Sequence, residues 1–267
     1  MIFREPAVQG LFYPNSKALL EKQLEKIFQN IPKEKNSQAV ISAHAGLIYS
    51  GATAAKSISS LKESKNYVIL CPNHTGFGKP VSIFPSGKWK TLLGEVKVNE
   101  KIAESIAKKI PEAELDQEAH LQEHAIEMQL LLLQKKFPDF QIIPICLAEQ
   151  RLEVLKRIGK TLSEASKEFE FGVIASSDFT HFEPEESAKE KDMEAIEKIL
   201  ANEVEGFYKI VFEKNMSICG FAGITALLEF ARLESLKARL LEYTSSAKTT
   251  HDSSNVVGYA SVAFEKN

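Results

Sequence analysis

The sequence predicts a single α/β domain in which helices flank one mixed β-sheet. Short apolar runs alternate with amphipathic stretches, and no Pro/Ser-rich linker or internal repeat divides the 267 residues. That length suits one large domain, so we assign residues 1–267 to it. Turn residues between Val81 and Val98 indicate antiparallel pairing, which makes the sheet mixed rather than purely parallel.

The helices are predicted from apolar residues that recur every three or four positions. In the first of them, Leu20, Leu24 and Ile27 fall on one face. The same periodicity predicts helices over residues 16–29, 100–110, 120–136, 151–168, 184–201 and 220–232.

The strands are predicted from short apolar runs rich in β-branched and aromatic residues. Runs such as "AVISA" and "YVILC" are apolar almost throughout, which is typical of strands buried on both faces. Strands are expected over 39–43, 67–71, 81–84, 140–147, 171–176, 237–243 and 256–264.

Composition limits the possible partners and locations. Hydrophobic residues make up 44% of the chain, charged residues 26%, and the net charge is −3. We therefore expect no broad basic surface for nucleic acid or an anionic membrane. No apolar run approaches the roughly 20 residues that a membrane helix needs, and charges at Arg4 and Glu5 do not fit a secretory signal. Three cysteines, an odd number, fit a reducing compartment, so the expected location is the cytoplasm.

Ionisable side chains follow three of the predicted strands. "AVISA" leads to His44, "YVILC" leads to His74, and "FGVIAS" leads to Asp178 and His181. In open α/β sheets, ligands bind beyond the carboxyl ends of the strands. A single histidine in such a place is usually structural, but three strand ends of the same kind predict a functional site.

The segment "HLQEH" carries a separate signal. In a continuous helix, His120, Glu123, His124 and Glu127 would share one face. The order H-x-x-E-H is that of inverted zinc proteases, in which two histidines bind zinc and the glutamate is the general base. The alternative is that these side chains form a pocket wall and orient other groups. The zinc hydrolase is the less favoured reading, because that architecture does not need histidines at strand ends.

The cysteines differ in their surroundings. Cys71 and Cys146 lie inside apolar runs, where a small buried hydrophobic residue is expected. Cys219 precedes Gly220 at the start of the predicted helix 220–232. A helix N-terminus favours the thiolate, which is both a nucleophile and a metal ligand. The residues alone leave open whether Cys219 is a buried structural thiol or a functional one.

Together these segments resemble a known family. The series "VQGLFYP", "HAGLIYSG", "PNHTGFG", "AHLQEHAIEMQL", "SSDFTHFEP", "ICG" and "VVGYAS" is similar to the Memo family, whose bacterial and archaeal members are labelled protein B of the AmmeMemoRadiSam system. The motifs run from about residue 4 to residue 264 in the family's order. The resemblance implies a fold like that of the class III extradiol (LigB-like) dioxygenases, which hold non-haem iron(II) with two histidines and one glutamate.

The resemblance also implies roles for individual residues. The family's metal positions fall on His44, His74 and Cys219, with the cysteine in place of the dioxygenase carboxylate. His181 matches the histidine that resembles the dioxygenase general base, and Asp178, in the same pocket, is the second candidate catalytic residue. The resemblance places His120 and His124 in the lining of the same pocket, and we expect Tyr49, Glu123 and Glu127 to line it as well or to orient the metal ligands from behind. Iron(II) is the expected metal, with copper or zinc as alternatives, because two imidazoles and one thiolate suit these ions better than magnesium or calcium.

Three classes of function follow from the sequence. The favoured one is a metal-binding redox enzyme acting on a small-molecule or peptide substrate, with a functional link to a radical SAM protein implied by the family's name. Ring cleavage is not assigned to it, because a thiolate ligand changes the redox behaviour and can itself be oxidised. The second is a non-enzymatic adaptor that keeps the pocket, since eukaryotic members of the family are described as binding phosphotyrosine peptides. The third is the zinc hydrolase.

Overall fold

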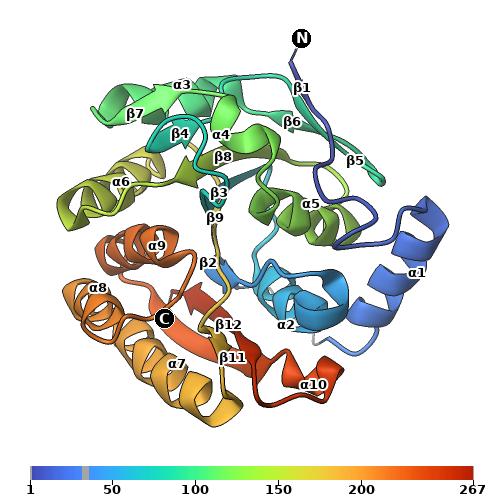
Figure 1. The fold of residues 1–267 in the computed structure, drawn as a ribbon. Coiled ribbons are helices and arrows are strands. Elements are labelled where there is room, and N and C mark those ends of the chain that lie inside the picture. The colour runs from blue at the N-terminus through green and yellow to red at the C-terminus, as the bar shows by residue number, and fades with distance from the viewer. Residues whose placement is uncertain (1, 32–35, 267) are drawn as a thin grey trace.

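The computed structural model describes residues 2–31 and 36–266, and it has the predicted α/β architecture of one mixed sheet between helices (Figure 1). Residues 1, 32–35 and 267, which the predicted domain includes, lie outside the described residues. The strands are β1 (Phe3–Arg4), β2 (Ser37–Ser42), β3 (Asn66–Pro72), β4 (Val81–Ile83), β5 (Lys88–Thr91), β6 (Gly94–Val98), β7 (Ala113–Leu115), β8 (Gln141–Leu147), β9 (Gly172–Ser176), β10 (His181–Glu183), β11 (Lys237–Ser245) and β12 (Val256–Glu265). The helices are α1 (Lys17–Phe28), α2 (Leu47–Ser60), α3 (Glu100–Lys109), α4 (Glu118–Leu121), α5 (Ala125–Lys136), α6 (Leu152–Ala165), α7 (Glu185–Leu200), α8 (Val204–Glu213), α9 (Phe221–Leu233) and α10 (Ala247–Thr250).

The sheet has a parallel centre and antiparallel additions. Its main path runs β1-β5-β6-β8-β3-β9-β2-β12-β10, with β11 beside β12 and β4 beside β8. The central strands β8, β3, β9 and β2 are parallel to their neighbours in this group. Strand β12 is antiparallel to β2, and β5 and β6 form the antiparallel pair expected between Val81 and Val98.

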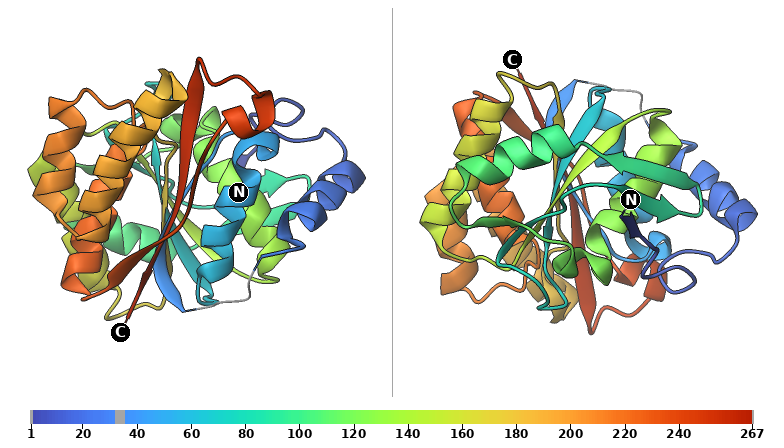
Figure 2. Two further views of the ribbon diagram at one scale, coloured as in Figure 1. Left: turned by 90° about the horizontal axis from the view of Figure 1, so that it is seen from below. Right: turned by 90° about the horizontal axis from the view of Figure 1, so that it is seen from above.

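Helices cover both faces of the sheet, so the central strands are buried on both sides (Figure 2). One core contains residues of α3, α6, α7, α8 and α9, and the other contains residues of α1, α2 and α5. In β3, Val68 and Leu70 face the first core, whereas Ile69 and Cys71 face the second. Two-sided burial explains why these strands read as continuous apolar runs. No helix in the described part of the chain combines the length and the apolar character needed to span a membrane.

Three of the described helices, α2, α8 and the short α10, were not predicted. In α2, small residues such as Ala54 and Ala55 are fully buried, and so are Ser57 and Ser59. Because small polar residues share the buried positions, the apolar periodicity that predicts a helix is diluted.

The predicted helix 120–136 is wrong as a single element, because the chain is interrupted between α4 and α5. The Arg4 guanidinium donates hydrogen bonds to the carbonyl oxygens of His120 and Glu123. The carboxylate of Glu123 accepts the backbone N–H of Ala125 at 2.9 Å, at the first residue of α5. These contacts replace bonds that a continuous helix would make, so the polar residues of "HLQEH" do not share one helical face.

Candidate metal centre

Three neighbouring strands bring the predicted side chains to one edge of the sheet. Strands β3, β9 and β2 are adjacent and parallel, so their carboxyl ends lie together. His44, His74 and Asp178 each stand two residues beyond the end of one of these strands. Because the three strands are adjacent and parallel, residues at the same distance beyond their ends lie close together. This is why polar residues that follow predicted strands indicated the position of the site.

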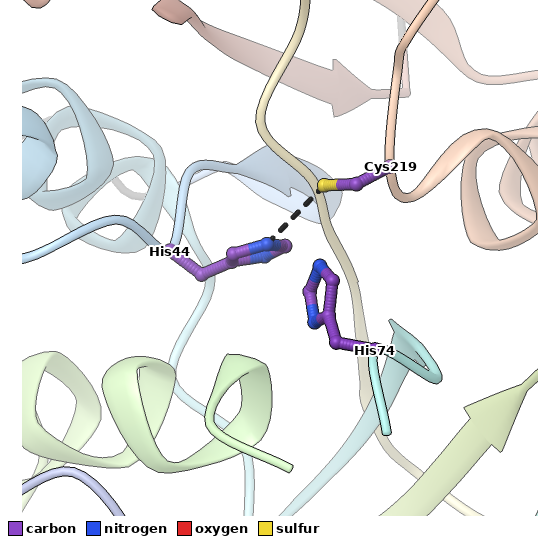
Figure 3. A group of neighbouring side chains, drawn as sticks. All are labelled: His44, His74 and Cys219. Carbon is purple, nitrogen blue, oxygen red and sulfur yellow. Dashed lines mark hydrogen bonds between the residues drawn. The ribbon is translucent and has the colours of Figure 1, made fainter. Parts of the chain in front are cut away.

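Two imidazoles and one thiol converge at this edge (Figure 3). One ligand atom from each of His44, His74 and Cys219 lies within 4.8 Å of the others. The Sγ atom of Cys219 is 3.3 Å from Nε2 of His44. The rings of His44 and His74 meet edge to face, with centroids 5.3 Å apart.

Cys219 reaches the site because the next residue is glycine. A Cβ atom at Gly220 would lie 2.4 Å from the carbonyl oxygen of Ser176, so only glycine allows this approach of the loop to β9. The backbone N–H of Asp178 donates to Sγ at 3.3 Å. Burial, followed by the nearby Asp178 carboxylate, raises the pKa of the Cys219 thiol in the metal-free protein. The expectation that the helix N-terminus would favour the thiolate is therefore wrong, because these two effects outweigh it.

His44 is buried and held at two points. Its backbone N–H donates to Oδ1 of Asp178 at 2.8 Å, and its Nδ1 lies 2.9 Å from the hydroxyl of Ser176. Burial, reinforced by the charge of His74, lowers the pKa of His44 to about 3. Burial also raises the pKa of the Asp178 carboxyl.

His74 is held by the carboxylate of Glu123. The two oxygens of Glu123 accept the backbone N–H of His74 at 2.7 Å and its Nδ1 at 2.9 Å. Burial raises the pKa of Glu123, but the hydrogen bond and charge of His74 outweigh it and bring the pKa to about 2. Burial lowers the pKa of His74, but the same pairing outweighs it and the pKa is raised. The arrangement is a carboxylate–histidine pair of the kind that orients metal ligands.

His124 lies against both imidazoles. Its ring stacks on that of His74 with centroids 4.6 Å apart, and Phe12 covers it at 4.7 Å. Burial, followed by the charge of His44, lowers the pKa of His124 to about 4. His74, Glu123 and His124 also place one ligand atom each within 4.8 Å of one another.

A cavity of about 530 Å³ opens above these side chains. Its lining includes His44, His74, His124, Asp178, His181 and Tyr49, together with the apolar side chains of Leu11, Phe12, Phe182, Val257 and Tyr259. His181 is fixed by Ser217, whose carbonyl oxygen lies 2.8 Å from its Nδ1 and whose hydroxyl accepts its backbone N–H at 2.7 Å. The residue after it, Phe182, has a positive φ of 61° and is 75% exposed.

The donor set fits a soft or borderline transition metal. Two imidazole nitrogens and one sulfur, on three separate loops, can occupy one side of an ion and leave further coordination positions facing the cavity. Iron, copper and zinc all accept this combination of ligands, whereas magnesium and calcium favour oxygen.

Comparison with known proteins finds similarity over nearly the whole described chain. The model of the Memo-like protein family matches residues 4–263. The chain belongs to the Memo family. Among its relatives, the MEMO1 family protein of Methanosarcina barkeri is 40% identical over 98% of this chain and 100% of the relative. That of Thermococcus onnurineus is 38% identical over 98% of this chain and 99% of its own length.

Three residues expected around the pocket of this Memo-family chain do not line the cavity: Glu123, which binds His74 from behind, and His120 and Glu127, which lie elsewhere. His120 is fully buried, with its ring against Phe84 and Trp89, and it does not line the cavity. Burial lowers its pKa to about 4. Glu127 is paired with Arg4 and also accepts the hydroxyl of Tyr13 at 2.6 Å. A zinc site built on His120 and His124 is therefore not supported, because the interruption before α5 points the two side chains into different surroundings.

Several residues that support the site had no prediction of their own. Ser176 and Gln129 contact each other beside His44, and Ser217 holds His181. Ser176 stands at the first position of the motif "SSDFTHFEP", but nothing in the motif separates it from Ser177. Gln129 lies in an apolar stretch of α5 and is fully buried. A polar residue that is buried in a helix indicates a specific partner, but the sequence does not show that it is buried.

Proposed function

We propose that this chain is a metal-dependent redox protein that holds iron(II), or alternatively copper, through His44, His74 and Cys219. Zinc also suits these ligands, but it has no redox chemistry and would make the site a Lewis-acid site only. One observation carries the proposal: three donor atoms from three separate loops lie within 4.8 Å of one another beside a cavity of about 530 Å³. Structural histidines and cysteines have no need to converge in this way at the mouth of a cavity. The cavity is large enough for a small molecule or for one side chain of a peptide.

The residues around the ligands support acid–base work on a substrate. A carbonyl oxygen can only accept, so the contact between His181 and the carbonyl of Ser217 requires the proton on Nδ1. Nε2 of His181 is then the basic nitrogen, and in this proposal it accepts a proton from a bound substrate. Asp178 fixes the backbone of His44 and lines the same cavity. A bound metal would supply a Lewis-acidic position and one-electron chemistry.

The proposal is tested by metal analysis of protein purified without oxygen, together with visible and near-ultraviolet absorption. The parent protein should bind about one equivalent of iron(II) or copper(II), and thiolate coordination should add a sulfur-to-metal charge-transfer band. Cys219→Ala should remove the band and weaken binding.

Cys146→Ala is the matched control, because Cys146 is fully buried in the sheet and is not one of the grouped ligands. It should leave both the affinity and the band unchanged. If Cys219→Ala binds metal with the affinity and spectrum of the parent, the ligand assignment fails.

A further inference from the structure

We propose that Ser176 and Gln129 are positioning residues that hold His44 in the tautomer protonated on Nδ1, so that Nε2 presents a bare lone pair beside Cys219. The inference rests on the proposed function, because it concerns one of the proposed metal ligands. It assigns a role to two side chains, one at the end of β9 and one in α5, that touch neither the cavity nor the sulfur.

Gln129, Ser176 and His44 are linked by successive hydrogen bonds, and Gln129 determines which group donates and which accepts. Its side-chain amide faces the backbone carbonyl of Ala43 at 2.9 Å and that of Ser42 at 3.3 Å. A carbonyl can only accept, so the group pointing there must be the NH₂ and not the amide oxygen. The same nitrogen lies 2.9 Å from the hydroxyl oxygen of Ser176, which therefore receives a donor from Gln129.

The single proton of the Ser176 hydroxyl is directed elsewhere. That hydroxyl donates to the carbonyl oxygen of Ala125 at 3.2 Å, at the first turn of α5. With its proton used there and one lone pair occupied by Gln129, the hydroxyl has one lone pair left for Nδ1 of His44 at 2.9 Å. In the proposed arrangement Nδ1 therefore carries the proton; the reverse arrangement, in which the hydroxyl donates to a bare Nδ1 instead of to Ala125, is the one that the test below distinguishes from it.

The other side of the imidazole agrees with this assignment. Nε2 of His44 lies 3.3 Å from Sγ of Cys219, which already accepts the backbone N–H of Asp178. A bare Nε2 can accept the thiol S–H, whose other acceptor is the carbonyl oxygen of Asp178 at 3.6 Å, whereas a protonated Nε2 would place a second donor against the sulfur. A metal ligand must likewise offer an unprotonated nitrogen.

The two proposed imidazole ligands are therefore oriented by different chemistry. His74 donates to the carboxylate of Glu123, whereas His44 donates to a neutral hydroxyl. The neutral partner lets His44 be oriented deep in the core without a second buried anion, whose desolvation would be costly.

The test reads the tautomer directly in the metal-free protein. Long-range proton–nitrogen NMR correlation of protein labelled with ¹⁵N-histidine distinguishes a protonated Nδ1 from a protonated Nε2, and the signals of His44 are assigned by their loss in His44→Gln. We expect His44 to be protonated on Nδ1. Protonation on Nε2 in the unaltered protein would overturn the inference, whatever the protein does with metal.

Two variants test the roles of the partners. Ser176→Ala removes the acceptor, and Gln129→Met removes the donor that sets the direction of the hydroxyl while keeping the shape of the side chain. Both should shift His44 toward a mixture of tautomers and weaken iron(II) or copper(II) binding roughly ten- to hundredfold, the range for residues that orient metal ligands.

Ser261→Ala is the matched control, because Ser261 is also a fully buried strand serine and its hydroxyl has no partner among the described residues. It should change neither the tautomer nor the affinity. If Ser176→Ala remains folded by near-ultraviolet circular dichroism and keeps Nδ1 protonated, the positioning role is refuted. If the parent shows the expected tautomer but binds no metal, the proposed function fails and the hydrogen-bond assignment stands.

Discussion

At the scale of single residues, the site combines a charged and a neutral way of orienting an imidazole. Glu123 is fully buried, yet it stays ionised because it accepts the N–H of Ala125, the N–H of His74 and the ring nitrogen of His74. A buried carboxylate is tolerated only with such compensation. The same bonds leave Nε2 of His74 as the nitrogen available to a metal.

Glu123→Gln should therefore weaken metal binding without removing it. The amide oxygen can still accept one of these hydrogen bonds. The negative charge, which makes the His74 imidazole a stronger metal ligand, is lost. We expect roughly a ten- to hundredfold rise in the dissociation constant for iron(II), measured by competition with a chelator of known affinity. Glu118→Gln, at an exposed position of α4, is the control and should bind like the parent. An unchanged affinity in Glu123→Gln would show that the carboxylate does not act on His74.

At the scale of elements, the N-terminal segment determines where α5 begins. Arg4 and Glu127 are both fully buried and form an ion pair, and Arg4 also lies 4.6 Å from the ring of Trp89. Glu127 further accepts the backbone N–H of Ala7 at 2.8 Å and the hydroxyl of Tyr13 at 2.6 Å. These contacts fix the segment that carries Leu11 and Phe12 into the wall of the cavity.

Breaking this ion pair from one side should be costly. Arg4→Met leaves the Glu127 carboxylate buried without its cation, so we expect a loss of about 3–5 kcal/mol in the free energy of unfolding, measured by urea denaturation. Adding Glu127→Gln to Arg4→Met should restore part of that loss, because the uncompensated charge disappears. Lys17→Met, at an exposed ion pair in α1, should cost less than about 0.5 kcal/mol. Equal losses in Arg4→Met and the double variant would contradict the pairing argument.

The elements also show what a sequence can and cannot predict. The central strands and the histidines beyond β2 and β3 were predictable, because two-sided burial leaves an apolar run and the polar residue after it marks the edge. The interruption before α5 was not, because Arg4 acts on carbonyl groups more than a hundred residues away in the chain. The place of Cys219 came only from the family resemblance, since residues 44 and 219 meet solely in the folded chain.

At the scale of the whole molecule, one buried carboxyl group ties separate parts of the C-terminal half of the chain to the site. Asp192 of α7 is fully buried and accepts the backbone N–H of Thr180 at 3.0 Å, its hydroxyl at 2.6 Å and the hydroxyl of Tyr243 in β11 at 2.8 Å. This carboxyl thus joins a helix, the loop between Asp178 and His181, and the edge of the sheet. Those three parts must be assembled together for the wall of the cavity to form.

The protonation of Asp192 should make the stability of the whole fold depend on pH in a particular direction. Burial raises its pKa above the ordinary 3.8, although its hydrogen bonds to Thr180 and Tyr243 act in the opposite direction. In the pH window that opens above 3.8, the folded protein then holds a proton that the unfolded chain has lost. Stability contributed by this group is greatest below that window and falls as pH rises through it.

Asp192→Asn should abolish this contribution. The amide oxygen can keep both bonds from Thr180, and the amide NH₂ can donate to the Tyr243 hydroxyl, which also accepts. The variant should therefore be more stable than the parent at neutral pH, and the advantage should shrink toward pH 4, as measured by urea denaturation at a series of pH values. Asp139→Asn, at a surface position whose side chain is 79% exposed, is the control. Its free energy of unfolding should change with pH in the same way as that of the parent. If Asp192→Asn is instead less stable than the parent at neutral pH, and this deficit shrinks toward pH 4, the ionised carboxylate stabilises the fold. The pKa of Asp192 would then be lowered by folding and not raised.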